Sequence, residues 1–200
     1  MKVIDKAREL LLRQEVAAFS PEIQRMNFGE DKRIYFDTFE GYAKATGTRT
    51  ISRREIKDGC TIIKGDIYII LVHERLTAAS RESLRSRWTL AHEIAHVFLG
   101  HRQDGEEEER QADRFASELL VPELILLELR KRLNRNLTVD EVSRLFGVSH
   151  NAAAVRLNHV FRRDFFSVYL KCELLQKYER IIQDYVKNAR RKQSLLVYVR

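Results

Sequence analysis

The sequence is poor in cysteine and contains no long apolar run. Its 200 residues include two cysteines, Cys60 and Cys172, which are too few for a disulfide framework and which we interpret as buried thiols. The longest uninterrupted aliphatic or aromatic run, Ile67 to Val72, is too short to cross a bilayer. The charged first residues resemble an amphipathic helix rather than a secretory leader. We therefore expect a cytoplasmic protein that has no membrane partner.

Charge is distributed unevenly along the chain. Residues 1–122 contain 20 basic and 21 acidic residues, whereas residues 123–200 contain 16 basic and 8 acidic residues. This shift predicts two regions, 1–122 and 123–200, and a chain of this length can form two small domains. The basic second region is compatible with nucleic acid or an acidic partner, and equally with a basic helical domain that binds neither.

Hydrophobic patterning predicts an α+β fold. Two β-branched runs flank Lys64-Gly65-Asp66, which indicates an antiparallel hairpin. Helices are expected over residues 80–99, ending at Gly100, and over residues 106–120. Residues 27–59 are mixed and polar and are left unassigned, whereas the chain after Pro122 is almost entirely helical in pattern, except that "SLLVYV" near the C-terminus could form a strand. We expect a domain with a small antiparallel sheet and helices, followed by a mostly helical region.

The stretch "TLAHEIAHVFLGH" places polar side chains inside an apolar helix. His92 and His96 are four residues apart and therefore lie on one helical face, close enough to bind one metal ion. Glu93 lies beside that face, where it can reach a water molecule on the metal. This His-Glu-x-x-His pattern is typical of zinc peptidases. The alternative is a pair of ordinary core or surface histidines with coincidental spacing.

A third ligand is expected from the helix "EEEERQADRFASELL". Its apolar stripe predicts one buried face, and extending that face by one turn reaches both Glu108 and Glu109, between which spacing alone does not choose. Asp113 follows Glu109 by four residues and could accept the second ring N–H of a ligand histidine. Glu106 and Glu107 are interpreted as a solvated acidic first turn. The residues of the stripe are Ala112, Phe115, Ala116, Leu119 and Leu120.

Residues 85–122 resemble the ImmA/IrrE family of metallopeptidases, which are compact gluzincins. The resemblance rests on "RWTLAHEIAHVFLGH" followed by "ERQADRFASELLVP". It implies that Glu109 is the third metal ligand and that Asp113 supports a ligand histidine. It also implies a zincin-like domain, in which the active-site helices pack on the small antiparallel sheet, and one Zn²⁺ per chain, with Mn²⁺ as the alternative metal.

Metal-assisted peptide hydrolysis follows from this arrangement. A zinc ion lowers the pKa of its bound water toward ~7, and Glu93 would take the proton and later deliver it to the leaving amine. A further donor should stabilise the oxyanion. His101 could be that donor, although a role at the helix end or behind a ligand suits it better. Weaker candidates for the donor are Arg87, His73 and Tyr68.

The strand expected at residues 67–72 precedes the active-site helix. It could be an edge strand, to which an extended peptide could add by backbone pairing, or an ordinary core strand, and the two interpretations are compatible.

The segment around Thr138, Gly147 and Ser149 is similar to a helix-turn-helix, with Thr138 and Ser149 as helix caps. Direct DNA binding through its second helix is not favoured, because Arg156 is the only full cation expected on the exposed face. A helical scaffold, or a surface that receives the substrate, fits better.

The resemblance implies a restricted endopeptidase that cleaves a helix-turn-helix transcriptional repressor of stress-response or mobile-element genes. One alternative is a DNA-binding regulator with a structural metal site. Another is a partner-binding module of a toxin–antitoxin or phage system.

Overall fold

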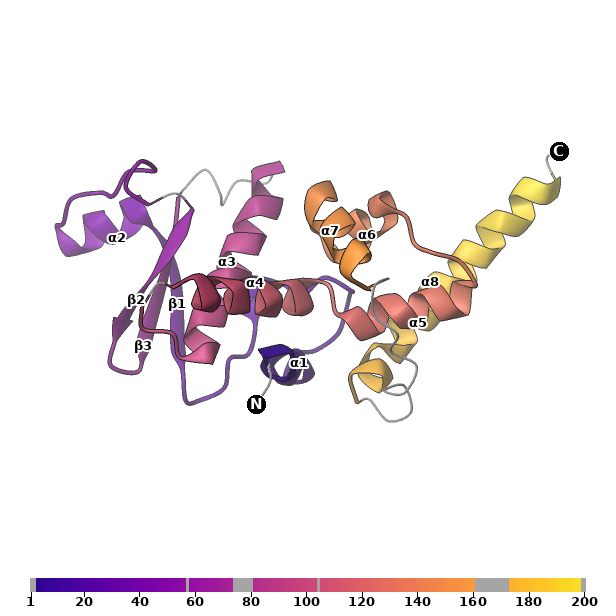
Figure 1. Cartoon of the computed structure of the whole chain (residues 1–200), viewed down its shortest axis with the longest axis horizontal. Helices are drawn as coiled ribbons and strands as arrows, with labels where there is room; N and C mark the ends of the chain where they lie inside the picture. Colours follow the sequence, from indigo (N-terminus) through magenta and orange to yellow (C-terminus); the bar gives the residue numbers. More distant parts are fainter. Residues whose placement is uncertain (1–2, 57, 74–80, 104, 161–172, 199–200) are drawn as a thin grey trace. The chain divides into compact units, whose positions relative to one another are not determined.

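The computed structural model describes residues 3–56, 58–73, 81–103, 105–160 and 173–198. The chain divides into two compact units (Figure 1). Unit 1 comprises Met1–Gln14 and Glu22–Leu120, and unit 2 comprises Glu15–Pro21 and Val121–Arg200. Among the described helices, none combines the length and apolar composition that crossing a bilayer requires. The α+β class is confirmed, since unit 1 contains both a sheet and helices.

The sheet of unit 1 is built around the predicted hairpin. Strand β2 (Gly59–Lys64) pairs antiparallel with β3 (Ile67–Val72), and Gly65 adopts a φ of 65° in the turn between them. Strand β1 (Arg33–Thr38), in a segment that patterning left unassigned, adds parallel to the other side of β3. The order within the described residues is therefore β1-β3-β2. The interpretation of residues 67–72 as an edge strand is wrong, because β3 pairs with β1 on one side and with β2 on the other. Among the described strands, β1 and β2 form the edges of the sheet.

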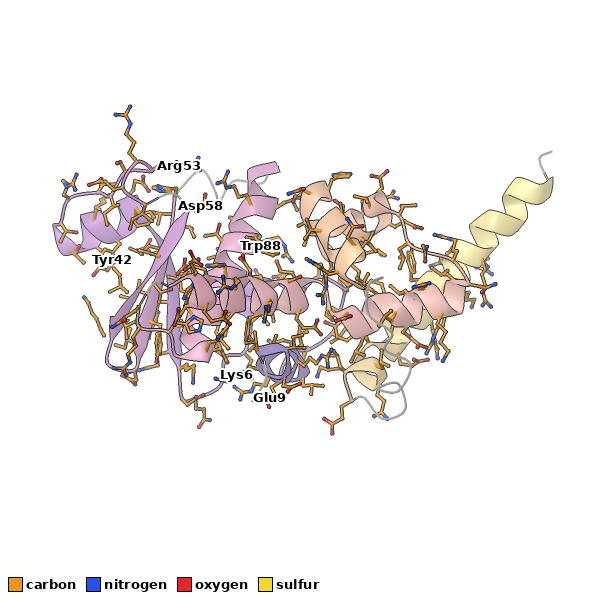
Figure 2. All side chains as sticks on the ribbon, in the orientation of Figure 1. Lys6, Glu9, Tyr42, Arg53, Asp58 and Trp88 are labelled. Carbon is orange, nitrogen blue, oxygen red and sulfur yellow. The ribbon has the colours of Figure 1, made fainter. Side chains whose placement is uncertain are left out.

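Helices pack around this sheet in unit 1. Helix α3 contacts β2 and β3, and α4 crosses α3 and also contacts α1 (Figure 1). The predicted stripe of α4, from Ala112 to Leu120, is buried as expected. Lys6 of α1 donates to the Phe98 carbonyl at 2.8 Å, which ties α1 to the end of α3 (Figure 2). The helices of unit 1 are α1 (Val3–Leu12), the 3-10 helix η1 (Ile23–Arg25), α2 (Phe39–Thr46), α3 (Arg81–Leu99) and α4 (Glu106–Leu120).

A close approach between β2 and α3 occurs at Gly59. A Cβ atom at this position would lie 2.7 Å from Thr89 Cγ2 and 3.0 Å from the Leu71 carbonyl oxygen. Contacts this short are strongly repulsive, so the absence of a side chain lets the strand lie against the helix. The same strand contains Cys60, which is half-buried rather than buried as expected, while Cys172 lies outside the described residues.

Unit 2 is helical in its described part. Its helices are α5 (Glu123–Leu133), α6 (Val139–Phe146), α7 (His150–Val160) and α8 (Glu173–Tyr198). The strand suggested for "SLLVYV" is wrong, because α8 continues to Tyr198.

Unit 2 has an aromatic core. The ring of Phe19 lies with its centroid 5.5 Å from that of Phe146, 6.0 Å from that of Tyr185 and 6.5 Å from that of Tyr178. Helix α6 begins with the expected capping box, in which Thr138 and Glu141 exchange hydrogen bonds. It ends at Gly147, with a φ of 59°. An aromatic cluster and the capped ends of α6 therefore stabilise this unit.

The Glu141 carboxylate should make the stability of unit 2 sensitive to acid. The hydrogen bond from Arg135 lowers the pKa of Glu141 most, burial raises it, and the hydrogen bond from the Thr138 backbone lowers it further. The pKa of Glu141 therefore falls from 4.5 to about 2. A lowered pKa in the folded state stabilises the protein above the unfolded value, and this contribution is lost as the pH falls from 4.5 toward 2. We expect Glu141→Gln to lower the free energy of unfolding by about 1–2 kcal/mol at pH 7, because it removes charge-assisted hydrogen bonds.

Urea unfolding at pH 7 and pH 3 measures this effect. The difference between wild type and Glu141→Gln should shrink at pH 3. Asp140→Asn is the matched control, because the pair between Asp140 and His150 is exposed and should contribute less than about 0.5 kcal/mol. The same Glu141→Gln deficit at both pH values would contradict the assignment.

Candidate active site

Two histidine rings converge on one face of α3. His92 and His96 lie one turn apart, and their Nε2 atoms are 3.0 Å from each other. Both side chains are largely buried, with 17% and 13% of their surface exposed. Two ring nitrogens that face each other at this distance need either a shared proton or a common positive ligand.

Helix α4 supplies a carboxylate to the same point. Glu109 Oε2 lies 3.1 Å from His92 Nε2, and Glu109 Oε1 lies 3.5 Å from His96 Nε2. The three potential ligand atoms are all within 4.8 Å of one another. Glu108, which spacing could not separate from Glu109, instead directs its carboxylate toward Gly105. Two imidazole nitrogens and one carboxylate oxygen form the donor set of a catalytic zinc site, so these residues fit a metal ion.

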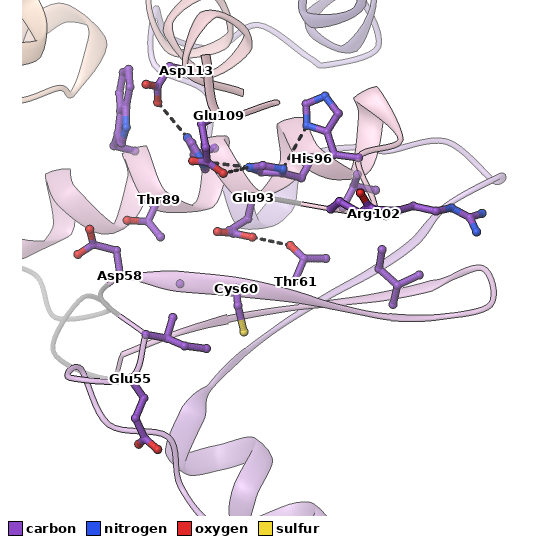
Figure 3. A pocket seen from close by; sticks show the side chains of 18 residues that line it. Glu55, Asp58, Cys60, Thr61, Thr89, Glu93, His96, Arg102, Glu109 and Asp113 are labelled. Carbon is purple, nitrogen blue, oxygen red and sulfur yellow. Dashed lines mark hydrogen bonds and ion pairs between the residues drawn. The ribbon is translucent and has the colours of Figure 1, made fainter. Parts of the chain in front are cut away.

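Asp113 orients the ring of His92 from behind. Its Oδ1 lies 3.0 Å from His92 Nδ1 (Figure 3). Because an ionised carboxylate only accepts, His92 Nδ1 donates to Asp113, and Nε2 is the ring nitrogen left to face Glu109 and the metal position. Burial opposes protonation of the ring, but the hydrogen bond and charge of Asp113, with the charges of Glu93 and Glu109, raise the pKa of His92 above its ordinary value.

The Glu93 carboxylate lies between α3 and strand β2. Thr61 Oγ1 donates a hydrogen bond of 2.7 Å to Glu93 Oε2, drawn as a dashed line in Figure 3. This contact holds the carboxylate at the wall of the pocket that also contains His92 and His96. A fixed, half-buried carboxylate beside a metal-binding set is suited to proton transfer.

His101 is the nearest of the suggested oxyanion donors to the histidine pair. Its Nδ1 lies 3.1 Å from His96 Nδ1. His73 is 5% exposed and its Nε2 contacts the Ile56 carbonyl at 2.8 Å. His73, Arg87 and Tyr68 are not among the residues that line the pocket, whereas His101 is.

The pocket is a cleft of about 640 Å³ between α3 and the edge strand. Asp58 and Trp88, labelled in Figure 2, lie on its wall together with residues of β2. A volume of this order can hold several residues of a peptide. The cleft therefore places the His92, His96 and Glu109 set next to an unpaired strand edge within the described part of the chain.

Sequence reasoning missed Thr61 and Gln111. Thr61 lies in a β-branched run whose alternation indicates a strand, but nothing in that run connects it to Glu93. Their contact depends on the close approach at Gly59, which only the folded chain reveals. Gln111 contacts His101 Nε2 at 3.3 Å, and its position two residues after the ligand candidate Glu109 gives no separate signal.

Comparison with protein families matches residues 43–158 to the IrrE N-terminal-like domain, a peptidase family. The comparison with curated proteins yields no match. The matched span covers more than half of the chain and includes β2, β3 and both helices of the site. The match implies peptide-bond hydrolysis with a metal cofactor and a protein substrate. The chain belongs to the ImmA/IrrE family of metallopeptidases, with the α+β fold of a small zincin-like domain and a helical region.

Proposed function

We propose that the chain is a zinc-dependent endopeptidase with His92, His96 and Glu109 as zinc ligands and Glu93 as general base. The observation that carries the proposal is the convergence of three ligand atoms within 4.8 Å, next to a carboxylate held at the cleft wall. Asp113 supports the His92 ligand through its 3.0 Å contact. A structural metal site would need no such base beside its ligands.

The chemistry divides between the metal and the chain. His92, His96 and Glu109 would hold the zinc ion, which would supply polarisation of the scissile carbonyl and a lowered pKa of water near neutral pH. Glu93 accepts the proton of the attacking water and transfers it to the departing amine. Thr61 holds one oxygen of that carboxylate by donating to it at 2.7 Å. These groups are fixed before substrate arrives, which lowers the entropic part of the barrier.

The edge strand β2 offers a way to align the substrate. It pairs only with β3 among the described strands, and Gly59, Cys60, Thr61 and Ile63 line the cleft. An extended peptide can add to such an edge through main-chain hydrogen bonds. Pairing on both sides of the scissile bond favours an endopeptidase that cuts extended or locally unfolded segments.

The proposed substrate is a cytoplasmic helix-turn-helix repressor, and residues 123–200 act as a scaffold or receive this substrate. The alternative of direct DNA reading by α7 loses its main support, because Arg156 is 8% exposed. Its guanidinium donates to the Val121 carbonyl at 2.9 Å instead of facing solvent, contrary to the expectation from sequence. The exposed face of α7 carries no lysine or arginine and therefore provides little attraction for phosphates.

Incubation with a helix-turn-helix repressor tests the function, and a repressor gene found next to this gene would nominate the substrate. We expect cleavage at one or a few bonds, loss of cleavage after chelation, and recovery with zinc. A parallel reconstitution with manganese identifies which metal supports turnover. Absence of cleavage together with salt-dependent binding to duplex DNA would favour the regulator instead.

Thr61→Val should slow turnover without weakening substrate binding. The variant removes a hydrogen bond to a charged group, worth about 1.5–3 kcal/mol, so we expect kcat to fall roughly 10–100-fold with KM little changed. Thr61→Ser keeps the hydroxyl and should retain most of the activity. Ile62→Val is the matched control, since Ile62 is the next residue of β2 and is not among the residues that line the cleft. Unchanged kcat in Thr61→Val would remove this residue from the mechanism.

A further inference from the structure

The chain folds back on itself immediately after α3. Gly100 adopts a φ of 77°, a left-handed conformation that favours glycine. The backbone N–H groups of Gly100 and His101 both donate to the His96 carbonyl at 3.0 Å. This turn brings the side chain of His101 against the ring of His96, on the side away from Glu109.

The two rings meet through equivalent nitrogens. His101 Nδ1 lies 3.1 Å from His96 Nδ1, and the ring planes are inclined at 76°. A contact between two neutral imidazoles requires one donor and one acceptor. Which ring donates determines whether His96 Nε2 has an electron pair for a metal ion.

The direction of this hydrogen bond is set from helix α4. Gln111 Nε2 lies 3.1 Å from Glu107 Oε1, and because a carboxylate only accepts, the Gln111 amide N–H must be the donor. The Gln111 carbonyl oxygen then lies 3.3 Å from His101 Nε2 and must accept. His101 consequently carries its proton on Nε2, and its Nδ1 accepts from His96.

We propose that Glu107, Gln111 and His101 are positioning residues that fix His96 as the tautomer with its proton on Nδ1 and its Nε2 electron pair facing His92 and Glu109. This inference rests on the proposed metal site and extends it. Asp113 achieves the same result for His92 in a single contact. Both ring nitrogens of His101 are engaged in this chain, so the structure assigns it to orientation rather than to the oxyanion.

Apoprotein tautomers and zinc affinity test the proposal in the full-length chain. Nitrogen-15 NMR of the metal-free wild type should show His96 protonated at Nδ1. His101→Leu and Gln111→Leu should depopulate that tautomer and raise the Kd for zinc about 10–100-fold, the usual effect of removing a partner behind a metal ligand. Zinc affinity is measured by competition with a chromophoric chelator.

Three comparisons make the result decisive. His101→Asn presents a carbonyl oxygen near the position of Nδ1, so it should recover most of the affinity, which a merely space-filling role would not require. Glu106 lies in the same turn as Glu107, and its carboxylate pairs with Arg110, so Glu106→Gln should bind zinc as the wild type does. If His101→Leu does not fold, Gln111→Leu carries the same test from a half-buried surface position.

The outcomes separate this inference from the function on which it rests. One outcome is that the wild type binds zinc and that both leucine variants keep the His96 tautomer and the zinc affinity of the wild type. This outcome overturns the positioning role of Glu107, Gln111 and His101 and leaves the peptidase proposal standing. Failure of the wild type to bind zinc overturns the proposed function. In that case the NMR spectrum of the apoprotein still decides whether His101 and Gln111 set the His96 tautomer.

Discussion

Glu93→Gln will abolish most repressor cleavage while leaving the metal site loaded. Glutamine preserves the size of the side chain and can still contact Thr61, but it cannot accept a proton at neutral pH. General acid–base catalysis by a positioned side chain contributes roughly 10²–10⁴-fold, so we expect kcat to fall by about that factor. Zinc content should remain close to one ion per chain, because Glu93 is not in the set of atoms that converges on the ion position.

The measurement pairs a cleavage time course with metal analysis of the same sample. Glu106→Gln makes the same chemical change at an exposed glutamate, 93% of whose side chain is accessible, and should cleave normally. Equal rates for wild type and Glu93→Gln would remove Glu93 from the reaction. Loss of zinc from Glu93→Gln would instead mean that this carboxylate helps to hold the ion.

Glu109→Gln should lose zinc affinity as well as activity, whereas Glu93→Gln should lose activity alone. The variant replaces a charged carboxylate, whose Oε2 lies 3.1 Å from His92 Nε2 and whose Oε1 lies 3.5 Å from His96 Nε2, with a neutral amide. Since loss of even an outer partner weakens metal affinity 10–100-fold, loss of a ligand should weaken zinc binding by at least about 100-fold. Activity at limiting zinc should fall in parallel and recover partly when zinc is in excess.

Glu108→Gln is the matched control for this experiment. Glu108 is the neighbouring glutamate that helical spacing alone could not exclude, and its carboxylate lies over Gly105. We expect its zinc affinity and cleavage rate to equal those of the wild type. A larger loss of affinity in Glu108→Gln than in Glu109→Gln would mean that the wrong glutamate has been assigned.

The residues that converge at the site were predictable where local periodicity governs geometry. The four-residue interval between His92 and His96 places both on one helical face in any regular helix. The apolar stripe of α4 likewise identifies the buried face, from which Glu109 and Asp113 extend toward α3. The β2–β3 hairpin follows from two β-branched runs around a glycine turn.

Features that depend on distant segments could not be read in this way. Strand β1 comes from a polar segment with little alternation, and its parallel pairing turned the expected edge strand β3 into the centre of the sheet. Arg156 looked exposed because its helix was considered alone, but the Val121 carbonyl accepts its hydrogen bond. The apolar "SLLVYV" suggested a strand, yet the preceding helix continues into it as far as Tyr198.

Gly59 gives the cleft an unusual vulnerability. The strand can lie this close to the active-site helix because Gly59 has no Cβ atom. A methyl group at this position would lie 2.7 Å from Thr89 Cγ2 and would collide with it. Any larger residue would wedge the wall outward and pull the Thr61 hydroxyl out of range of Glu93. A mutation that deletes no chemical group could thus silence the enzyme, and loss-of-function screens should find position 59 beside the ligands themselves.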